Sequence, residues 1–512
     1  MECGIFFLSI VLFLIFEIIF VLFNKLRRPK DFPPGPRWFI PFIGNARYLR
    51  KLARQHGGQH KAFNVLAKEF NSPIFSLKLG SEYVVVVMTY PFVKEIYSRE
   101  EFEGRPDNFF LRLRTMGTRL GITCTDEKFW SEQRSFVVRQ LRNIGYGKSI
   151  MQERINDEMN EILDILRNSN EKPVWPGGSN LLATSVINIL WTFTTGTKID
   201  RNDERLVKFF DLLQRRSKAF DMSGGWLTQM PWLRFIAPEA TGYNLINDLN
   251  SKFYAFFMEF VDEHLRKYSD EKSNDDLIYA FLKEMKEREG QADSTFTIKQ
   301  LIMVILDIFI GGSQTTSTAI DLALMTMVIY PEIQRKCHEE LERVVDAADG
   351  ELPSYSDRKK TPYIDAVILE VIRLYSIAPI TGPRRTLKDC KLDNYIIPKN
   401  TTILIGLESA LNDETIWKDP KTFNPERFLD SNMNVINTDS FIPFGTGRRR
   451  CLGDQLAKEC IYKFFVGILS EFTLHMSDKE EDAPSMDLLP GILLSPKPYK
   501  IVFRKKNSKK FV

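Results

Sequence analysis

Histidine, on which many protein metal sites depend, is scarce in this chain: there are five in 512 residues. His56 and His60 are separated by a Gly-Gly pair, and His338 precedes two glutamates but lacks the second histidine of a zinc-binding helix. The pattern predicts solvated histidines in loops or at the surface. It excludes a metal centre built from histidine.

Cysteine and net charge are also limited. Six cysteines lie far apart and do not form the dense framework of a secreted disulfide scaffold, which fits a reducing compartment. The 70 basic and 66 acidic side chains leave a net charge of +4, too balanced to indicate a nucleic-acid partner. There is no internal repeat and no long low-complexity tract. By length alone the chain would divide into about two to four domains.

One apolar run stands at the N-terminus. Gly4 to Phe23 reads GIFFLSIVLFLIFEIIFVLF, and 20 helical residues span about 30 Å, enough for a bilayer core. Basic residues follow at once, whereas the N-terminal flank has none, so the positive-inside rule puts the N-terminus across the membrane. The alternative, a cleaved signal peptide, is disfavoured because a basic n-region and a small-residue cleavage site are missing. Residues 1–24 are therefore predicted to be a transmembrane anchor.

Residues 25–45 form a basic and proline-rich linker. The stretch Phe32 to Gly44, FPPGPRWFIPFIG, contains four prolines, which cannot continue a helix. This composition predicts a stiff tether between the anchor and the body.

In the body, residues 46–512, helical periodicity dominates and strand signals are short. Apolar residues at three- and four-residue spacing predict helices, for example over Gln152–Arg167, Asp203–Phe220, Ser251–Lys267 and Pro331–Val345. Strands are predicted over Ile74–Leu79, Tyr83–Met88, Tyr395–Ile397, Thr402–Ile405 and Tyr499–Phe503. The fold class is therefore mainly α, with a small mixed sheet.

A second long apolar run extends from Ile298 to Tyr330 and stops at Pro331. As a helix it would measure about 50 Å, and its first half is apolar on nearly every face, which indicates burial. A second membrane span is the alternative reading. Polar residues within the run, among them Asp307 and Asp321, make it the weaker one.

Two adjacent glycines, Gly311 and Gly312, interrupt this run. In a helix they cost roughly 1 kcal/mol each, which favours a functional kink where a ligand approaches the backbone. The nearby threonines could equally well hydrogen-bond to the preceding turn. The residues by themselves leave both readings open.

Near the C-terminus the chain reads FIPFGTGRRRCLGDQLAKEC, with Cys451 between a glycine turn rich in arginine and the start of a helical pattern. Glycines permit tight turns and the close approach of a flat ligand. Guanidinium groups favour a thiolate and pair with carboxylates. A haem offers both an iron for sulfur and propionates for arginine. The alternative is a structural cysteine in a surface turn. The haem is favoured because five residues occur together at fixed spacing: Phe444, Gly447, Arg449, Cys451 and Gly453.

This stretch resembles the cysteine-ligand loop of the cytochrome P450 family, whose pattern is filled by Phe444, Gly447, Arg449, Cys451 and Gly453. The resemblance extends from about Pro33 to the C-terminus. It implies a single helix-rich catalytic domain with the cytochrome P450 fold and haem b (iron protoporphyrin IX) as cofactor. It also implies that Cys451 is the axial iron ligand, that Arg449 holds a propionate and that Phe444 packs near the sulfur.

The same resemblance assigns the glycine-interrupted run to the oxygen-binding groove of the family. Thr315 would hydrogen-bond dioxygen there and help to deliver protons. The preceding residue is commonly Asp or Glu in the family, whereas this chain has Gln314. Glutamine can orient water but cannot release a proton, so the proton relay would run through water and Thr315.

Further side chains match family positions that contact the propionates or support the fold. The expected propionate contacts are Arg105, Trp130, Arg134 and Arg384, of which Trp130 and Arg134 lie four apart on one helical face. Glu370, Arg373 and Arg427 match the Glu-Arg-Arg cluster of the family. That cluster supports the haem-side core and is not catalytic.

Apolar segments are expected to line a substrate pocket by resemblance: Phe109–Leu120, Phe209–Trp232, Leu306–Thr315, Ile377–Thr381 and Gly491–Leu494. The segment Met222–Pro238 has two tryptophans and could either dip into a membrane surface or pack in the core. A basic proximal face would dock a reductase, with Lys128, Arg139, Arg142, Arg448, Arg450 and Lys458 as its candidates.

These features predict a single-pass enzyme of the endoplasmic reticulum membrane, with a cytoplasmic catalytic domain that inserts one oxygen atom of O2 into a small hydrophobic substrate. Electrons would come from NADPH through NADPH–cytochrome reductase, with cytochrome b5 as a second candidate donor. A hormone or isoprenoid precursor, an aromatic amino acid and a xenobiotic all remain open as substrates. Two other classes are considered: a haem-thiolate isomerase or dehydratase that needs neither O2 nor reductase, and a non-catalytic haem sensor or electron carrier.

Overall fold

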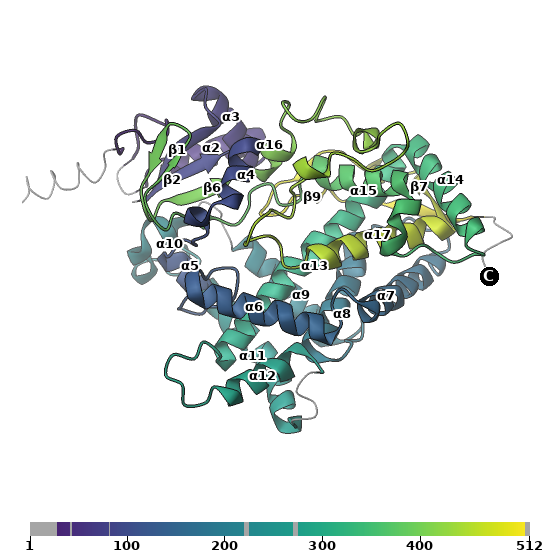
Figure 1. The fold of residues 1–512 in the computed structure, drawn as a ribbon, viewed down its shortest axis with the longest axis horizontal. Coiled ribbons are helices and arrows are strands. Elements are labelled where there is room, and N and C mark those ends of the chain that lie inside the picture. Colours follow the sequence, from purple (N-terminus) through teal and green to yellow (C-terminus); the bar gives the residue numbers. More distant parts are fainter. Residues whose placement is uncertain (1–27, 41–42, 81, 220–224, 270–274, 507–512) are drawn as a thin grey trace, which may run out of the picture.

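The computed structural model describes residues 28–40, 43–80, 82–219, 225–269 and 275–506. It is a mainly helical body with a small sheet region at one end (Figure 1), which confirms the predicted fold class. The predicted N-terminal span lies outside the described residues, as do residues 220–224 and the terminal basic tail from residue 507 onwards.

The elements are as follows. The helices are α2 (Ala46–His56), α3 (Gln59–Glu69), α4 (Tyr90–Ser98), α5 (Phe109–Arg114), α6 (Glu127–Ile144), α7 (Ser149–Arg167), α8 (Leu181–Thr195), α9 (Glu204–Lys218), α10 (Gly225–Gln229), α11 (Tyr243–Lys267), α12 (Leu277–Glu287), α13 (Ile298–Ile329), α14 (Pro331–Ala347), α15 (Pro362–Tyr375), α16 (Leu407–Leu411) and α17 (Asp454–Glu471). The strands are β1 (Ile74–Leu79), β2 (Glu82–Val87), β3 (Arg384–Arg385), β4 (Cys390–Leu392), β5 (Tyr395–Ile397), β6 (Thr402–Ile405), β7 (Phe472–Met476), β8 (Leu488–Leu489), β9 (Ser495–Pro496) and β10 (Ile501–Lys505).

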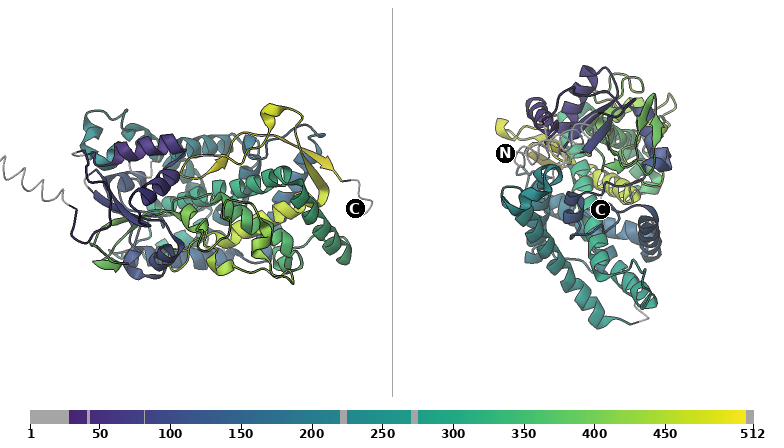
Figure 2. Two further views of the ribbon diagram at one scale, coloured as in Figure 1. Left: turned by 90° about the horizontal axis from the view of Figure 1, so that it is seen from above. Right: turned by 90° about the vertical axis from the view of Figure 1, so that its left-hand side faces the viewer.

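The largest sheet has the strand order β1-β2-β6-β3, with β2 and β6 parallel and the other neighbours antiparallel. Alternate side chains of β2 enter two separate cores. Val84 and Val86 pack with α2 and α3 on one face, whereas Val85 and Val87 pack with α4 and α16 on the other. The pairs β7–β10, β4–β5 and β8–β9 form three small antiparallel sheets. The β7–β10 pair lies at the opposite end of the molecule from the four-stranded sheet (Figure 2).

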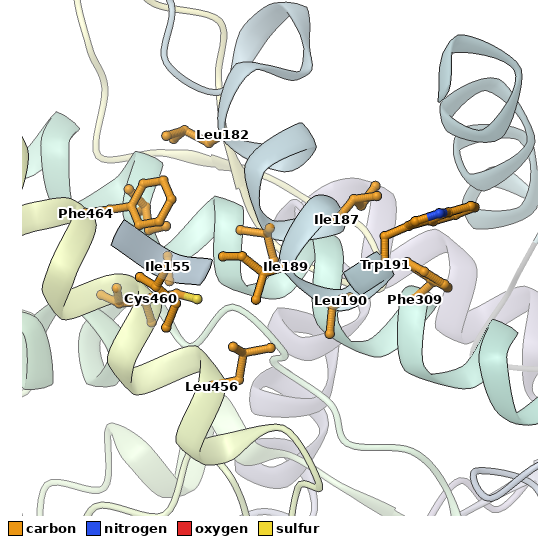
Figure 3. Packing of buried hydrophobic residues seen from close by; sticks show 14 of the residues in the cluster. Ile155, Leu182, Ile187, Ile189, Leu190, Trp191, Phe309, Leu456, Cys460 and Phe464 are labelled. Atoms are coloured by element: carbon orange, nitrogen blue, oxygen red, sulfur yellow. The ribbon is translucent and has the colours of Figure 1, made fainter. Parts of the chain in front are cut away.

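Helix α13 runs through the main core. Its first turn is capped by the Thr297 side chain, which accepts a hydrogen bond from the Gln300 backbone N–H, and Pro331 starts the next helix directly after it. Figure 3 shows Phe309 of α13 beside Trp191 of α8, with ring centroids 5.1 Å apart. Helix α17 also packs on α13, and its Cys460 lies away from this ring pair, beside Ile155. This three-helix contact explains why apolar residues occupy nearly every face of α13.

Among the described residues, α13 is the only helix that is both long enough and apolar enough to cross a membrane. Both of its halves are nevertheless buried by other helices, including Leu301 to Leu306 and Leu322 to Val328. We therefore assign α13 to the protein core. The sequence likewise disfavoured a second membrane span.

One expectation differs from the structure. Histidines were expected in solvated positions, but His60 and His338 are buried, and burial lowers the pKa of each to about 4. Both therefore fill neutral core positions. The described part of the linker packs on the body: the Ser76 N–H of β1 donates to the Pro34 carbonyl over 2.6 Å, and Phe32 is buried.

Candidate functional site

The cysteine loop is shaped by two glycines and closed by a backbone hydrogen bond. Gly445 and Gly447 adopt left-handed conformations with φ of 67° and 71°, and a Cβ on Gly447 would lie 2.2 Å from the Tyr97 carbonyl oxygen. The Cys451 N–H donates to the Phe444 carbonyl over 2.8 Å. The loop thus delivers Cys451 just before α17 begins at Asp454.

The sulfur of Cys451 occupies a mixed environment. Its side chain is exposed, yet surrounding protein atoms desolvate the sulfur enough to raise the pKa of the thiol. The Gly453 backbone N–H, Arg134 and Lys458 oppose this rise, because each stabilises the anion. The chain alone therefore favours the thiol, and a metal ion would be needed to hold the thiolate.

Arg449 is a buried cation without a partner. None of its three guanidinium nitrogens has a hydrogen-bond acceptor, and its Cζ atom lies 3.7 Å from the ring centroid of Trp130. Burial, followed by the positive charges of Arg105 and Arg384, lowers its pKa to about 8. Because guanidinium holds its proton in proteins, this shift marks an uncompensated charge that an anion would stabilise.

Two further predicted residues adjoin Arg449. Arg105 donates from Nη1 to the carbonyls of Gly382 and Pro383 over 2.9 and 2.7 Å, while its buried Nε has no partner. Arg384, on β3, is buried, and its pKa is lowered to about 9, first by burial and then by Arg105. The structure therefore gathers three arginines whose charges repel one another.

These residues fit a haem. The two propionates at one edge of a haem would supply counter-charges for the arginines. Trp130 offers a flat apolar neighbour for the ring, and the Cys451 sulfur is available for the iron. Among the described residues, no group of three or more His, Cys, Asp or Glu could hold a metal ion. A metal bound by Cys451 would therefore take its other ligands from a macrocycle.

Arg134 has a different geometry from the other predicted arginines. It lies on the same face of α6 as Trp130, as expected, but its Nη2 donates to the Arg450 carbonyl over 2.8 Å. The side chain thus holds the backbone of the cysteine loop. Phe444 also lies in this loop, with Lys458 Nζ 5.1 Å from its ring centroid.

The two adjacent glycines of α13 have different surroundings. A Cβ on Gly312 would lie 2.8 Å from Cδ1 of Leu190, so close packing against α8 explains this glycine. A Cβ on Gly311 would meet nothing within 4 Å, and Gly311 is exposed although most of the helix is buried. One turn on, Thr315 donates from Oγ1 to the Gly311 carbonyl over 2.7 Å, as the hydrogen-bonding alternative predicted. Helix α13 continues through this point, and Gln314 beside Thr315 is partly buried.

Sequence reasoning missed an anchor that joins α13 to the loop before α6. Asp307 Oδ2 accepts hydrogen bonds from the backbone N–H groups of Ile122 and Thr123 over 2.7 and 2.9 Å. The signal in the sequence was an acid within an apolar run, which we used only as an argument against a membrane span. Asp307 instead fixes a loop that borders the site.

The Glu370 cluster is fully buried. Arg373 donates from Nε and Nη2 to the two Glu370 oxygens over 2.6 and 2.9 Å, and Arg427 donates from Nε to Glu370 over 3.0 Å. Neither Glu370 nor Arg373 has an exposed side chain. The expected grouping of these three residues is thus present in the structure, with further bonds to backbone carbonyls such as that of Pro420.

Two of the predicted lining segments meet directly, because the Leu494 N–H donates to the Ile377 carbonyl over 2.8 Å. The segment before α11 exposes large apolar side chains: Trp226, Trp232, Phe235 and Ile236. In its described part, the segment thus presents these four side chains to the surface, while Leu227 packs in an apolar cluster with Phe110, Leu113 and Ile246.

Comparisons with known proteins agree with this geometry. The sequence model of a family described as Cytochrome P450 matches residues 33–503. The chain is 51% identical over 494 residues to "Probable cytochrome P450 305a1" of Drosophila melanogaster, covering 96% of this chain and 97% of the relative. It is 33% identical to "Farnesoate epoxidase" of Bombyx mori, covering 98% and 99%, and 32% identical to "Cytochrome P450 2J2" of Homo sapiens, covering 93% and 91%.

Proposed function

Because the chain belongs to the cytochrome P450 family, we propose that it is a membrane-attached monooxygenase that oxidises a small lipophilic substrate with electrons from NADPH. The family membership makes it a haem-dependent oxidoreductase with haem b held by a cysteine thiolate. The assignment of individual residues and of the substrate is our proposal. The observation that carries it is the group of Arg105, Arg384 and Arg449, whose last member stands two residues before Cys451 and has no acceptor for its guanidinium.

In this proposal Cys451 is the iron ligand, and the three arginines hold the propionates against Trp130. The bound haem supplies the redox chemistry that splits dioxygen. Arg134 holds the cysteine loop by its bond to the Arg450 carbonyl. Thr315 holds or transfers a proton at Oγ1, and Gln314 orients water beside it.

Replacing Arg449 tests the propionate assignment. We expect Arg449→Gln to release haem about tenfold faster or more, because charged hydrogen bonds to a carboxylate are lost. The measurement is haem transfer from the holoprotein to an excess of apomyoglobin. Arg448→Gln is the matched control, since Arg448 is exposed and pairs with Glu103 over 3.1 Å. Equal release rates for both variants would contradict the assignment.

Removing the Thr315 hydroxyl tests the proton pathway. We expect Thr315→Val to lower the product formed per NADPH consumed about tenfold or more, since a positioned proton donor is lost. Haem content should not change. Thr316→Val is the control, because Thr316 is the next residue on α13 and is buried. The role would be refuted by a Thr315→Val enzyme that couples NADPH to product as well as the control does.

A basic face near the cysteine loop supports a reductase as the electron donor. Arg139, Arg142, Arg448 and Arg450 are exposed, as is Lys128, while Lys458 is partly buried. Positive charge on this face would attract an acidic flavin-bearing reductase, and cytochrome b5 is a second candidate. Five of the six predicted basic residues are thus available to a partner.

Exposed aromatic and apolar side chains support attachment to the endoplasmic reticulum membrane. Trp38, Phe235 and Ile236 are 89%, 76% and 72% exposed. Such groups gain free energy at a membrane interface, where tryptophan is favoured. We propose that they rest on the bilayer to which residues 1–24 anchor the chain in a single pass.

The function is tested by reconstitution with NADPH–cytochrome reductase and a panel of lipophilic metabolites. The panel includes isoprenoid precursors, since one relative carries the name farnesoate epoxidase, together with aromatic amino acids and xenobiotics. We expect NADPH-dependent products that carry one atom from labelled dioxygen. Turnover without NADPH and dioxygen would instead indicate an isomerase or dehydratase. A haem that refuses carbon monoxide would indicate a sensor or electron carrier.

A further inference from the structure

A second buried arginine lies outside the cluster around Cys451. Arg216 on α9 is 8% exposed, and its Nε has no hydrogen-bond partner. Its Nη1 donates to Asn250 Oδ1 over 3.2 Å and its Nη2 donates to the Arg114 carbonyl over 2.8 Å. Within the described part of the chain, no carboxylate forms an ion pair with it. A buried charge with only neutral partners is costly, which points to an anionic ligand.

No carboxylate among the described residues pairs directly with Arg216. The charge of Asp307 acts on it from a distance, while Asp307 Oδ2 accepts hydrogen bonds from the backbone N–H groups of Ile122 and Thr123. Arg114 adds a second positive charge, and burial keeps the nearby Cys124 thiol neutral by raising its pKa. Burial first, and then Arg114, lowers the pKa of Arg216 to about 9. Arg216 therefore has no direct counter-ion among the described residues.

Arg216 lies where α5, α9 and α11 meet. Asn250 of α11, which accepts from Arg216, also donates from Nδ2 to the Leu113 carbonyl of α5 over 2.7 Å. An apolar cluster joins the same region, formed by Phe110, Leu113, Leu227 and Ile246. The guanidinium is thus fixed in place by three elements and has apolar surroundings.

This position is connected with the proposed catalytic site. Arg105 interacts electrostatically with Cys124 and Asp307 on one side and with Arg449 on the other. On α13, Asp307, Gly311 and Thr315 are spaced by four residues and share one face. The distance along the helix from Asp307 to Thr315 is about 12 Å.

We propose that Arg216, with Arg114 beside it, binds the carboxylate of an amphiphilic substrate whose apolar chain extends along α13 toward Thr315. This inference rests on the proposed monooxygenase function and names its substrate class. Thr315 lies about 12 Å along α13 from Asp307, so an extended chain needs about ten bonds, at about 1.2 Å per bond, to reach from the level of Asp307 to that of Thr315.

A purely structural role for Arg216 makes a different prediction. As a clamp between helices it would contribute to stability and would affect charged and uncharged ligands alike. As an anion site it discriminates between ligands that differ only in charge. The discriminating experiment therefore varies the charge of the ligand on the unchanged holoprotein.

The probes are dodecanoic acid, its methyl ester and dodecylamine, with binding to the holoprotein measured by isothermal titration calorimetry. We expect the acid to bind about tenfold more tightly than the ester, or better, and the amine to bind most weakly. Arg216→Gln should remove the preference for the acid and leave the ester affinity unchanged. Arg215→Gln is the matched control, because Arg215 is the adjacent arginine and pairs at the surface with Asp248 over 3.2 Å.

Equal affinities of the unchanged holoprotein for acid and ester would overturn the proposal, and that comparison needs no variant. Equal weakening of acid and ester by Arg216→Gln would also overturn it, in favour of the clamp. Calorimetry reports binding without turnover, so failure of the substrate assignment leaves NADPH-dependent oxidation of other lipids intact. Failure of the monooxygenase assignment would instead abolish oxidation of every substrate while the acid preference remained.

Discussion

Cys451→Ala is expected to lower turnover about 1,000-fold or more, equivalent to about 4 kcal/mol of transition-state stabilisation. The thiolate donates electron density that favours cleavage of dioxygen, and alanine cannot replace it. The hydrogen bond to the Phe444 carbonyl and the glycine turns position Cys451 in its loop. The measurement is product formation per haem in the reconstituted system.

Cys390→Ala provides the control for this variant. Cys390 is a partly buried free cysteine on β4, outside the cysteine loop. We expect it to retain turnover within about twofold, since a partly exposed position tolerates small losses. Full turnover by Cys451→Ala would remove the role assigned to that sulfur.

Glu370→Gln is expected to lower the free energy of unfolding of the holoprotein by about 3–5 kcal/mol. The substitution keeps the size of the side chain but leaves the buried Arg373 and Arg427 without their counter-charge. Arg373 also donates to the carbonyls of Leu411 and Pro420. Loss of its counter-charge would therefore also affect the segment that precedes the cysteine loop. Urea unfolding followed by tryptophan fluorescence measures the change.

An exposed ion pair on α14 provides the comparison. Glu339→Gln removes the partner of Arg335, and both of these side chains are more than half exposed. Such pairs contribute about 0–1 kcal/mol. If Glu370→Gln cost no more than Glu339→Gln, the buried cluster would not have the supporting role that we assign to it.

Local patterns predicted much of this molecule. The turn before Cys451 followed from its glycines, and the grouping of Glu370, Arg373 and Arg427 followed from the family resemblance. Strands β1, β5 and β6 have the predicted bounds. Boundaries set by tertiary contacts were less accurate: α11 begins at Tyr243 rather than Ser251. The last strand begins at Ile501, because Tyr499 donates its hydroxyl to Asp321 on α13.

The remaining features depend on contacts between residues far apart in the chain. Asp307 binds the backbone of Ile122 and Thr123 from a different part of the fold, which no local pattern records. Gly312 leaves room for Leu190 of another helix, whereas a side chain at Gly311 would meet no neighbour. The sequence alone could not show that the two glycines differ in this way. Arg216 likewise reads as an ordinary surface charge until its burial is known.

The central claim is that the sulfur of Cys451 binds the iron of a porphyrin. The most direct measurement is the carbon monoxide difference spectrum of the purified, reduced protein, together with electron paramagnetic resonance of its ferric form. The account predicts the spectra of a thiolate-ligated haem, and predicts that they disappear in Cys451→Ala but not in Cys390→Ala. Protein that binds no porphyrin, or spectra typical of a nitrogen ligand in its place, would contradict it.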